Sequence, residues 1–235
     1  MNNWLSNNNQ QIEYYLKSND VILVGRKYQI NLLLNLIGHY KKNENSLFLD
    51  FGCGDGIISK IILSKFPNNT IDLLDGSDEM IKKLESSFTS KNINIIKMNF
   101  HNWINQNIED KYDLIFSSMA IHHLEHFDKN QLFSKIFSAL KYNGLFVNID
   151  VVKPSSKKIE EYQFEMWKKS ILEQLNNDIE KFEQHRNLPS IYKNKTENKP
   201  STLISQLNML ENIGFEDVDC HYKNGIFALF SGVKR

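Results

Sequence analysis

The sequence predicts an α/β fold in which a doubly wound, mostly parallel sheet is covered by helices on both faces. Short apolar runs alternate with segments of helical periodicity, and a glycine cluster follows the first of these runs. The 235 residues suit one such domain with a modest insertion. Hydrophobic residues make up 41% of the chain and charged residues 24%, so the composition supports a packed core.

The first two thirds of the chain supply the predicted core. Residues 4–17 mix aromatic and polar side chains and favour a short helix, and residues 28–37 carry apolar side chains at helical spacing. The expected order then continues with strand 46–51, helix 56–66, strand 71–75, helix 78–88, strand 93–98, strand 112–117, helix 129–140 and strand 145–150. Asn143-Gly144 is expected to end the last of these helices as a C-cap or turn. Strands and helices that alternate at this spacing predict βαβ units, with ligand-binding loops at the carboxyl edge of the sheet.

The pattern changes after Pro154. Residues 157–182 are charged with helical periodicity, and residues 186–200 are polar and predict a loop. Helix 202–212 is followed by strands 218–222 and 226–233, joined by Lys223-Asn-Gly as an antiparallel hairpin. We therefore expect an N-terminal helical part (1–45), an α/β core (46–150), an insertion over the sheet edge (151–200) and a C-terminal helix with hairpin (201–235).

Composition excludes several classes of protein. The 28 basic and 28 acidic side chains give a formal net charge of zero, which argues against tight binding of long nucleic acids. Cys53 and Cys220 form no CxxC pair, and the spacing of the histidines matches no standard ligand set, so we expect no disulfide framework and no metal site. The polar start of the chain and the lack of a long apolar run predict a cytoplasmic protein without membrane contact.

A glycine-rich turn carries the strongest functional signal. Strand 46–51 runs into Gly52-x-Gly54-x-Gly56 and then a helix, so that the backbone can approach a ligand closely. Asp75 ends the second strand, 19 residues after Gly56, where an acid can accept hydrogen bonds from ribose hydroxyls. The two features predict an adenosine-containing ligand, either a dinucleotide or S-adenosylmethionine.

The run Asp50-Phe-Gly-Cys-Gly-Asp-Gly resembles the first motif of the class I S-adenosylmethionine-dependent methyltransferases of the small-molecule type. Further features follow in that family's order: Leu74-Asp-Gly-Ser-Asp-Glu-Met-Ile, Met98-Asn-Phe-His, Tyr112-Asp-Leu-Ile-Phe-Ser-Ser-Met-Ala-Ile-His-His-Leu, Leu140-Lys-Tyr-Asn-Gly-Leu-Phe and Gly214-Phe-Glu-Asp-Val. The resemblance covers about residues 26–150 and 200–235. The chain departs from the family at Asn99, where an acid is usual, and at Tyr142 and Asn143, which replace Pro and Gly.

The resemblance implies a Rossmann-like methyltransferase fold, S-adenosylmethionine as cofactor and a small-molecule acceptor. By this resemblance, Asp75 would bind the ribose, Met80 would pack near adenine, and Asn99 would contact the adenine ring. Arg26 would reach the methionine carboxylate. Tyr15 would belong to a leading segment that folds over the cofactor as a lid. The complete set of expected cofactor-binding residues is Arg26, Tyr15, Asp50, Gly52, Cys53, Gly54, Asp55, Gly56, Asp75, Gly76, Ser77, Met80, Asn99, Phe100, His101, Ser117, Ser118 and Met119. For His101, as for His126, a plain loop or surface position is the alternative.

Methyl transfer from a sulfonium is an in-line displacement, so the protein mainly positions the reactants. A general base is needed only where the nucleophile arrives protonated. His122 and His123 follow the fourth strand and are the candidate catalytic residues, with pocket shaping as the alternative. The insertion follows the fifth strand, where similar enzymes recognise the acceptor; Phe164 and Trp167 there either line a pocket or pack in a core.

Three other functions stay open on the sequence alone: an RNA or modified-nucleotide methyltransferase, an NAD-dependent oxidoreductase, and a cofactor-binding protein without catalysis. A basic patch beside the pocket would favour the first, and binding of NAD would favour the second. The acceptor, its target atom and the oligomeric state are likewise open.

Overall fold

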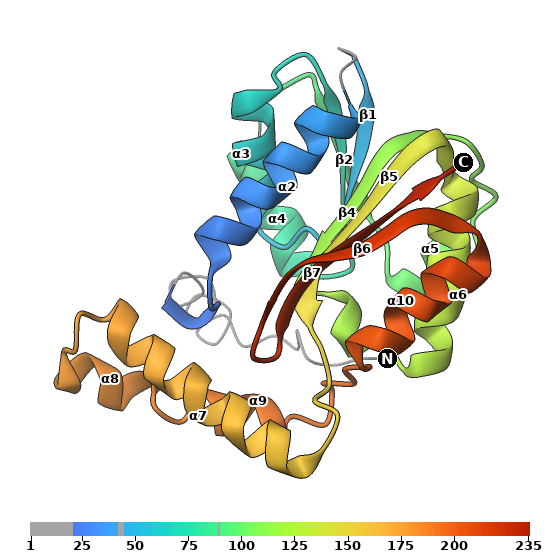
Figure 1. Ribbon diagram of the computed structural model, residues 1–235. Helices are drawn as coiled ribbons and strands as arrows, with labels where there is room; N and C mark the ends of the chain where they lie inside the picture. Colours follow the sequence, from blue (N-terminus) through green and yellow to red (C-terminus); the bar gives the residue numbers. More distant parts are fainter. Residues whose placement is uncertain (1–20, 42–44, 89) are drawn as a thin grey trace.

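The computed structural model describes residues 21–41, 45–88 and 90–235 and contains a seven-stranded sheet in the order β3-β2-β1-β4-β5-β7-β6 (Figure 1). The strands are β1 (Leu47–Phe51), β2 (Thr70–Asp75), β3 (Ile93–Lys97), β4 (Tyr112–Ser118), β5 (Leu140–Val151), β6 (Phe215–Asn224) and β7 (Phe227–Lys234). Strands β1 to β5 pair in parallel, whereas β7 is antiparallel to both β5 and β6. The predicted fold class, including the C-terminal hairpin, is confirmed.

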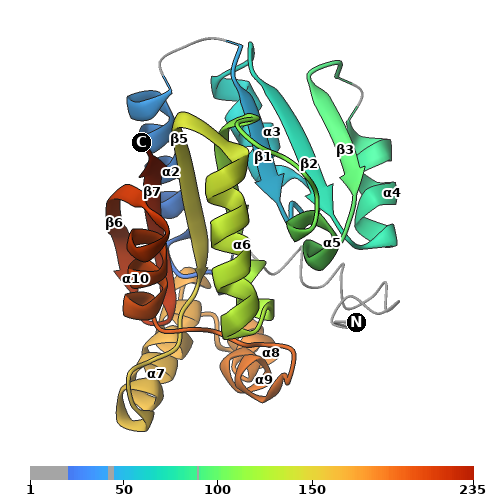
Figure 2. The same cartoon turned by 90° about the vertical axis from the view of Figure 1, so that its right-hand side faces the viewer.

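Six of the helices in the described residues form two layers around this sheet, and three lie beyond its edge. They are α2 (Arg26–Tyr40), α3 (Ile57–Lys65), α4 (Asp78–Ser87), α5 (Phe100–Ile104), α6 (His126–Ala139), α7 (Lys157–Gln174), α8 (Ile179–His185), α9 (Leu188–Asn194) and α10 (Leu203–Ile213), with a 3₁₀ turn η2 (Ile121–His123). One layer contains α2, α3 and α4, and the other contains α5, α6 and α10 (Figure 2).

Alternate residues of each central strand enter opposite cores. In β4, Leu114 and Phe116 pack with the α2–α4 layer, whereas Ile115 packs with the α5–α6–α10 layer. Because both faces are covered, the strand reads as a continuous apolar run rather than an alternating one. This double cover is the reason that the short apolar runs predicted parallel strands correctly.

The strand order places the functional loops. β1 lies between β2 and β4, so the chain turns in opposite directions from the middle of the sheet. In open α/β sheets a ligand binds at such a switch point, beyond the carboxyl ends of the strands. Residues 52–56, 76–77 and 119–125 follow β1, β2 and β4 and meet at this edge.

Helices α7, α8 and α9 lie beyond the same edge (Figure 1). Phe164 and Trp167 are buried there in a third core together with Leu23, Val24 and Phe227. The indole Nε1 of Trp167 also donates to the carbonyl of Ile22 at 2.8 Å. The insertion is therefore packed against the segment before α2, and the two aromatic side chains make core contacts.

Three expectations about local structure were wrong. The expected helix 157–182 is broken between α7 and α8, where Asn176 and Asn177 have positive φ and Asp178 caps the next helix. The expected loop 186–200 contains α9, which starts with a proline in its first turn. The helix expected at 129–140 is present as His126–Ala139, but Asn143, at φ 61°, lies within β5 and does not cap the helix.

Helix α5 was also missed, because its five residues are too few to show periodicity. None of the helices in the described part of the chain is long and apolar enough to cross a membrane.

Candidate active site

The glycine turn after β1 has two kinds of position. Gly52 has φ 73°, and a Cβ there would lie 2.5 Å from the Cβ of Ala120, so only glycine fits. Gly54 also has positive φ, 56°, but a Cβ on it would meet nothing within 4 Å. Gly56 caps α3 at φ 71°. The turn is thus closely packed at Gly52 and open at Gly54, as expected where a ligand approaches the backbone.

Asp75 ties this turn to the end of β2. Its Oδ2 accepts from the amide of Gly54 at 2.9 Å, and its Oδ1 accepts from the amide of Ser77 at 2.8 Å. Burial raises the pKa of Asp75, while these backbone hydrogen bonds act in the opposite direction. A carboxylate is therefore held beside the open surface at Gly54, where the sequence predicted an acid for ribose.

Asp50 lies under the turn rather than at its surface. It is 2% exposed, and its Oδ2 accepts from the hydroxyl of Ser59 at 2.6 Å. Burial is the main cause that raises the pKa of Asp50 to about 7, and the nearby charges of Asp75 and Asp55 add to it. The site thus contains a buried acid that titrates near neutral pH.

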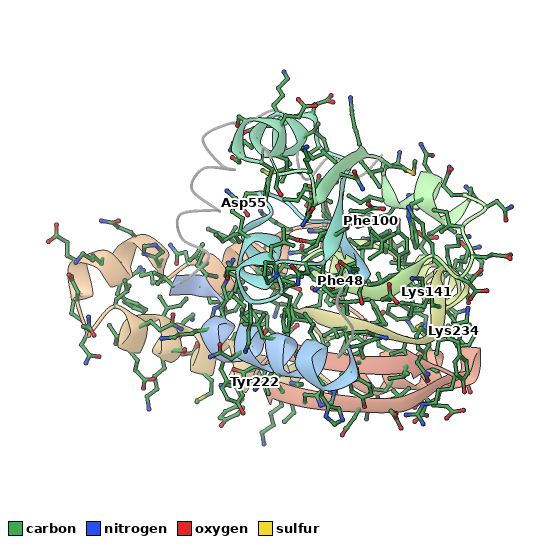
Figure 3. The ribbon with its side chains drawn as sticks, turned by 90° about the horizontal axis from the view of Figure 1, so that it is seen from above. Phe48, Asp55, Phe100, Lys141, Tyr222 and Lys234 are labelled. Carbon is green, nitrogen blue, oxygen red and sulfur yellow. The ribbon has the colours of Figure 1, made fainter. Side chains whose placement is uncertain are left out.

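The loops after β2 and β3 meet beside this turn. A Cβ on Gly76 would lie 3.3 Å from the Cα of Asn99, so the two backbones touch. Asn99 caps α5, since its Oδ1 accepts from the amide of Asn102 at 2.8 Å. Phe100 stacks on Phe51 with the ring centroids 4.5 Å apart. In Figure 3, Phe100 and Asp55 both appear on the side of the sheet that carries β1 and β2.

Several other predicted cofactor residues have structural partners. Ser77 caps α4 by accepting from the amide of Met80, and Met80 is buried. Ser117 is buried and donates to the carbonyl of Phe51 at 2.7 Å, which joins the ends of β4 and β1. Met119, at φ 57°, packs against the third core under the insertion. These side chains fix the floor of the site.

The start of α2 is anchored by β6. The hydroxyl of Tyr222 donates to the carbonyl of Val24 at 3.1 Å, and Figure 3 shows Tyr222 beside α2. Gly25 packs so closely on Tyr222 that a Cβ would lie 2.2 Å from its hydroxyl oxygen. Arg26 follows as the first residue of α2. Tyr15 lies outside the described residues.

His122 is paired with a residue that the sequence did not single out. Its ring Nδ1 lies 2.6 Å from Oδ1 of Asp150, and its backbone amide donates to Oδ2 of the same side chain at 2.8 Å. Asp150 lies near the end of β5, next to β4 in the sheet. In the sequence, Asp150 is marked only as an acid near a strand end. Its pairing with His122 can be seen only when β5 lies beside η2.

His123 has a different environment from His122. Its Nδ1 lies 3.2 Å from the carbonyl oxygen of Glu197, to which it donates. Burial and the neighbouring ring of His122 lower the pKa of His123 to about 2. His123 therefore stays neutral. His101 is exposed, 3.3 Å from Asp128.

The end of the insertion is fastened to this histidine turn. The amide of Lys199 donates to the carbonyl of His122 at 2.8 Å. Lys129 of α6 is buried, and its Nζ donates to the carbonyl oxygens of Leu124 and Lys199. Burial lowers the pKa of Lys129 to about 8. This buried lysine was missed because its position on a helix looks like a solvated one.

A groove of about 700 Å³ opens beside the histidine turn, between the insertion and the start of α10. Tyr192 and Lys199 line it, and the ring centroid of Tyr192 lies 6.1 Å from that of His122. Its remaining polar wall includes His126, Lys153 and Lys193. A volume of this size suits a small organic molecule.

Residues 48–144 match a protein family described as a methyltransferase domain. Malonyl-[acyl-carrier protein] O-methyltransferase 1 of Ilyobacter polytropus is 36% identical over 137 residues, which are 58% of this chain and 48% of that protein. Carboxy-S-adenosyl-L-methionine synthase of Nautilia profundicola is 19% identical over 213 residues, 88% of this chain and 85% of that protein. The chain thus spans about half the length of the first curated relative.

Solved structures share the fold. Human N-acetylserotonin methyltransferase in complex with S-adenosylmethionine has a TM-score of 0.56 at 16% identity, over 95% of this chain and 53% of that one. An O-methyltransferase family protein from Burkholderia thailandensis has a TM-score of 0.58 at 10% identity, over 87% of this chain and 55% of that one.

Proposed function

We propose that this chain, which belongs to the class I S-adenosylmethionine-dependent methyltransferases, transfers a methyl group from S-adenosylmethionine to a small-molecule acceptor. The carboxylate of Asp75, fixed on the amides of Gly54 and Ser77, carries this proposal. It places an acceptor of hydrogen bonds beside the one open position of the glycine turn.

The residues present fit the cofactor. Asp75 accepts backbone hydrogen bonds from Gly54 and Ser77, and the amide of Gly76 also acts on it. Because a carboxylate offers about four lone-pair sites, a ribose hydroxyl can still bind. The Oδ1 of Asn99 is used as a helix cap, which leaves its amide nitrogen to donate to a ring nitrogen of adenine. When bound, S-adenosylmethionine supplies a methyl group that is already activated on a sulfonium sulfur.

The other residues of the chain bind, orient and shield. We assign Arg26 to the methionine end of the cofactor, and His122 to the acceptor side. Residues 151–200 cover the acceptor and exclude water, and residues 46–150 with 201–235 form the cofactor-binding core. The expected lid at the start of the chain falls largely outside the described residues. Both cysteines are free thiols, which agrees with a reducing compartment such as the cytoplasm.

The names of the relatives supply a first candidate acceptor. Several are malonyl-[acyl-carrier protein] O-methyltransferases, so a malonyl group linked to a carrier protein is one acceptor to test. The groove beside His122 is large enough for a small acyl group.

Mass spectrometry with S-adenosylmethionine labelled in its methyl group tests the proposal. The purified chain is incubated with the labelled donor and an acceptor panel that includes malonyl carrier protein. We expect formation of S-adenosylhomocysteine together with a labelled product, and loss of both in Asp75→Asn. A donor that is consumed to give a carboxylated form of itself, as the name of the Nautilia relative describes, would contradict methyl transfer.

A further inference from the structure

Lys129 is a buried cation at an unfavourable place in the fold. It lies near the start of α6 and is 1% exposed. The N-terminus of a helix carries a partial positive charge, and removal of an ammonium group from water costs free energy. Because replacement of buried charges by apolar side chains is often neutral or stabilising, stability alone does not explain this lysine.

The ammonium group of Lys129 joins two segments that are distant in sequence. Its Nζ donates to the carbonyl of Leu124, at the end of the histidine turn, and to the carbonyl of Lys199, at the end of the insertion. Against the effect of burial on its pKa, the carboxylate of Asp150 favours the protonated form. Hydrogen bonds from a charged donor are stronger than those between neutral groups. The lysine thus holds residues 197–201, which we call the closing segment, against the histidine turn.

The closing segment makes further contacts at the same place. The amide of Lys199 donates to the carbonyl of His122 at 2.8 Å, and the amide of Lys153 donates to the carbonyl of Ser201 at 2.9 Å. The ammonium group of Lys199 also pairs with Glu125 at 3.1 Å, but both side chains are partly exposed, and such pairs contribute little. The buried ammonium group described above is screened far less by solvent.

The closing segment forms one wall of the groove beside the histidine turn. Residues 198–201 all line this groove, whereas Lys129 lies outside its lining. The side-chain amide of Asn198 donates to the carbonyl of Tyr192 at 2.7 Å, and the ring of Tyr192 faces His122. A displacement of the closing segment would therefore change the shape of the groove and the position of this aromatic ring.

We infer that Lys129 is a positioning residue of the acceptor site: it holds the closing segment against the histidine turn and so keeps the groove in the form that binds the acceptor. This inference rests on the proposed methyltransferase function and adds a residue to its acceptor side. Without the contact, only a fraction of the molecules have this wall in place, and the apparent affinity for the acceptor falls by that fraction. Once the acceptor is bound the wall is in place, so the rate of methyl transfer is little changed.

Hydrogen exchange tests the positioning without any acceptor. Lys129→Met keeps an unbranched side chain of similar length but removes the donor. We expect the backbone amides of the closing segment, that of Lys199 above all, to exchange at least about tenfold faster in this variant. Exchange in β1 should stay as in the wild type and shows that the variant is folded. Unchanged exchange in the closing segment would overturn the inference.

Lys135→Met is the matched control. Lys135 lies on the same helix, and its Nζ also donates to a backbone carbonyl, that of Ile108, at 2.8 Å. This variant should leave exchange in the closing segment unchanged; equal acceleration there would mean a general loosening of α6 and would overturn the inference. Lys129→Gln keeps a shorter donor, should give an intermediate rate, and replaces Lys129→Met in the comparison if the latter does not fold.

Steady-state kinetics separates positioning from a merely structural role. The assay uses labelled S-adenosylmethionine and the member of the acceptor panel that the wild type methylates. In Lys129→Met we expect the KM of this acceptor to rise at least about tenfold, with kcat changed less than about threefold. A fall in kcat at unchanged KM would overturn the inference.

Calorimetric titration with S-adenosylmethionine separates the two levels of the account. The Kd should be the same in Lys129→Met and the wild type, because Asp75 and the glycine turn are unchanged. Absence of binding in the wild type contradicts the proposed function. Normal binding in both proteins, with unchanged exchange and unchanged KM in the variant, contradicts only the positioning role.

Discussion

The hydroxyl of Ser59 donates to Oδ2 of Asp50 at 2.6 Å, from the first turn of the helix that follows the glycine turn. This contact holds a buried carboxyl group under the cofactor site. Because no cation pairs with Asp50 in the described structure, burial dominates and raises its pKa to about 7.

Replacement of Asp50 by Asn should therefore flatten the pH dependence of stability. The pKa of Asp50 is about 7 in the folded chain and the ordinary pKa of an aspartate is 3.8, so the folded chain holds this proton more tightly between these values. The free energy of unfolding then falls as pH rises through that window, by an amount on the order of 2–4 kcal/mol. Urea unfolding at pH 5 and pH 8 should show this loss in the wild type and not in Asp50→Asn.

A change at an exposed acid, Glu161→Gln, is the control and should keep the wild-type dependence on pH. Equal loss of stability between pH 5 and pH 8 in the wild type and Asp50→Asn would contradict the assignment of a raised pKa to this carboxyl.

Replacement of Gly52 should mainly lower stability, whereas replacement of Gly54 should mainly weaken cofactor binding. Gly52→Ala puts a Cβ 2.5 Å from that of Ala120 at positive φ, so we expect a stability loss of about 2–4 kcal/mol. In Gly54→Ala the new Cβ meets no protein atom within 4 Å, so the stability loss should stay at about 1 kcal/mol while binding of S-adenosylmethionine weakens more than tenfold. Thermal melting and calorimetry measure the two effects. Equal binding by Gly54→Ala and the wild type would show that the ligand does not approach this position.

Trp167 should control how firmly the insertion holds the segment before α2. Trp167→Phe keeps a ring in the third core but removes the hydrogen bond to the carbonyl of Ile22, at a cost of about 1–2 kcal/mol. Hydrogen exchange should then accelerate in residues 21–24. Tyr222→Phe removes the separate hydrogen bond from β6 to the carbonyl of Val24, so it should also accelerate hydrogen exchange in this segment. Unchanged exchange in both variants would mean that core packing alone fixes this segment.

Much of the fold could be predicted because its signals are local. The strands are apolar runs bounded by glycine, proline or polar turns, and the C-terminal hairpin has a turn sequence of its own. Helix α9 could not be predicted, because it has little periodicity and is held by contacts such as that of Tyr192 with Trp167, whose ring centroids lie 5.8 Å apart. Its stability therefore comes from tertiary packing.

Part of the candidate site could likewise be predicted from local sequence signals, and part depends on tertiary structure. Gly52, Gly54 and Asp75 follow from a motif and a spacing, both visible along the chain. The partners Asp150 and Lys129 depend on the placement of β5 and α6 beside the histidine turn. The sequence marks Asp150 only as an acid near a strand end, and it does not mark Lys129. The separation of His122 from His123 likewise required the two hydrogen-bond partners, which lie 28 and 74 residues away.

Calorimetric titration with S-adenosylmethionine, S-adenosylhomocysteine and NAD tests the central claim most directly, in the wild type and in Asp75→Asn. The account predicts micromolar binding of both sulfur ligands, no binding of NAD, and at least tenfold weaker binding in the variant, whose melting temperature should confirm that it is folded. Binding of NAD without either sulfur ligand would contradict the account and point to an oxidoreductase.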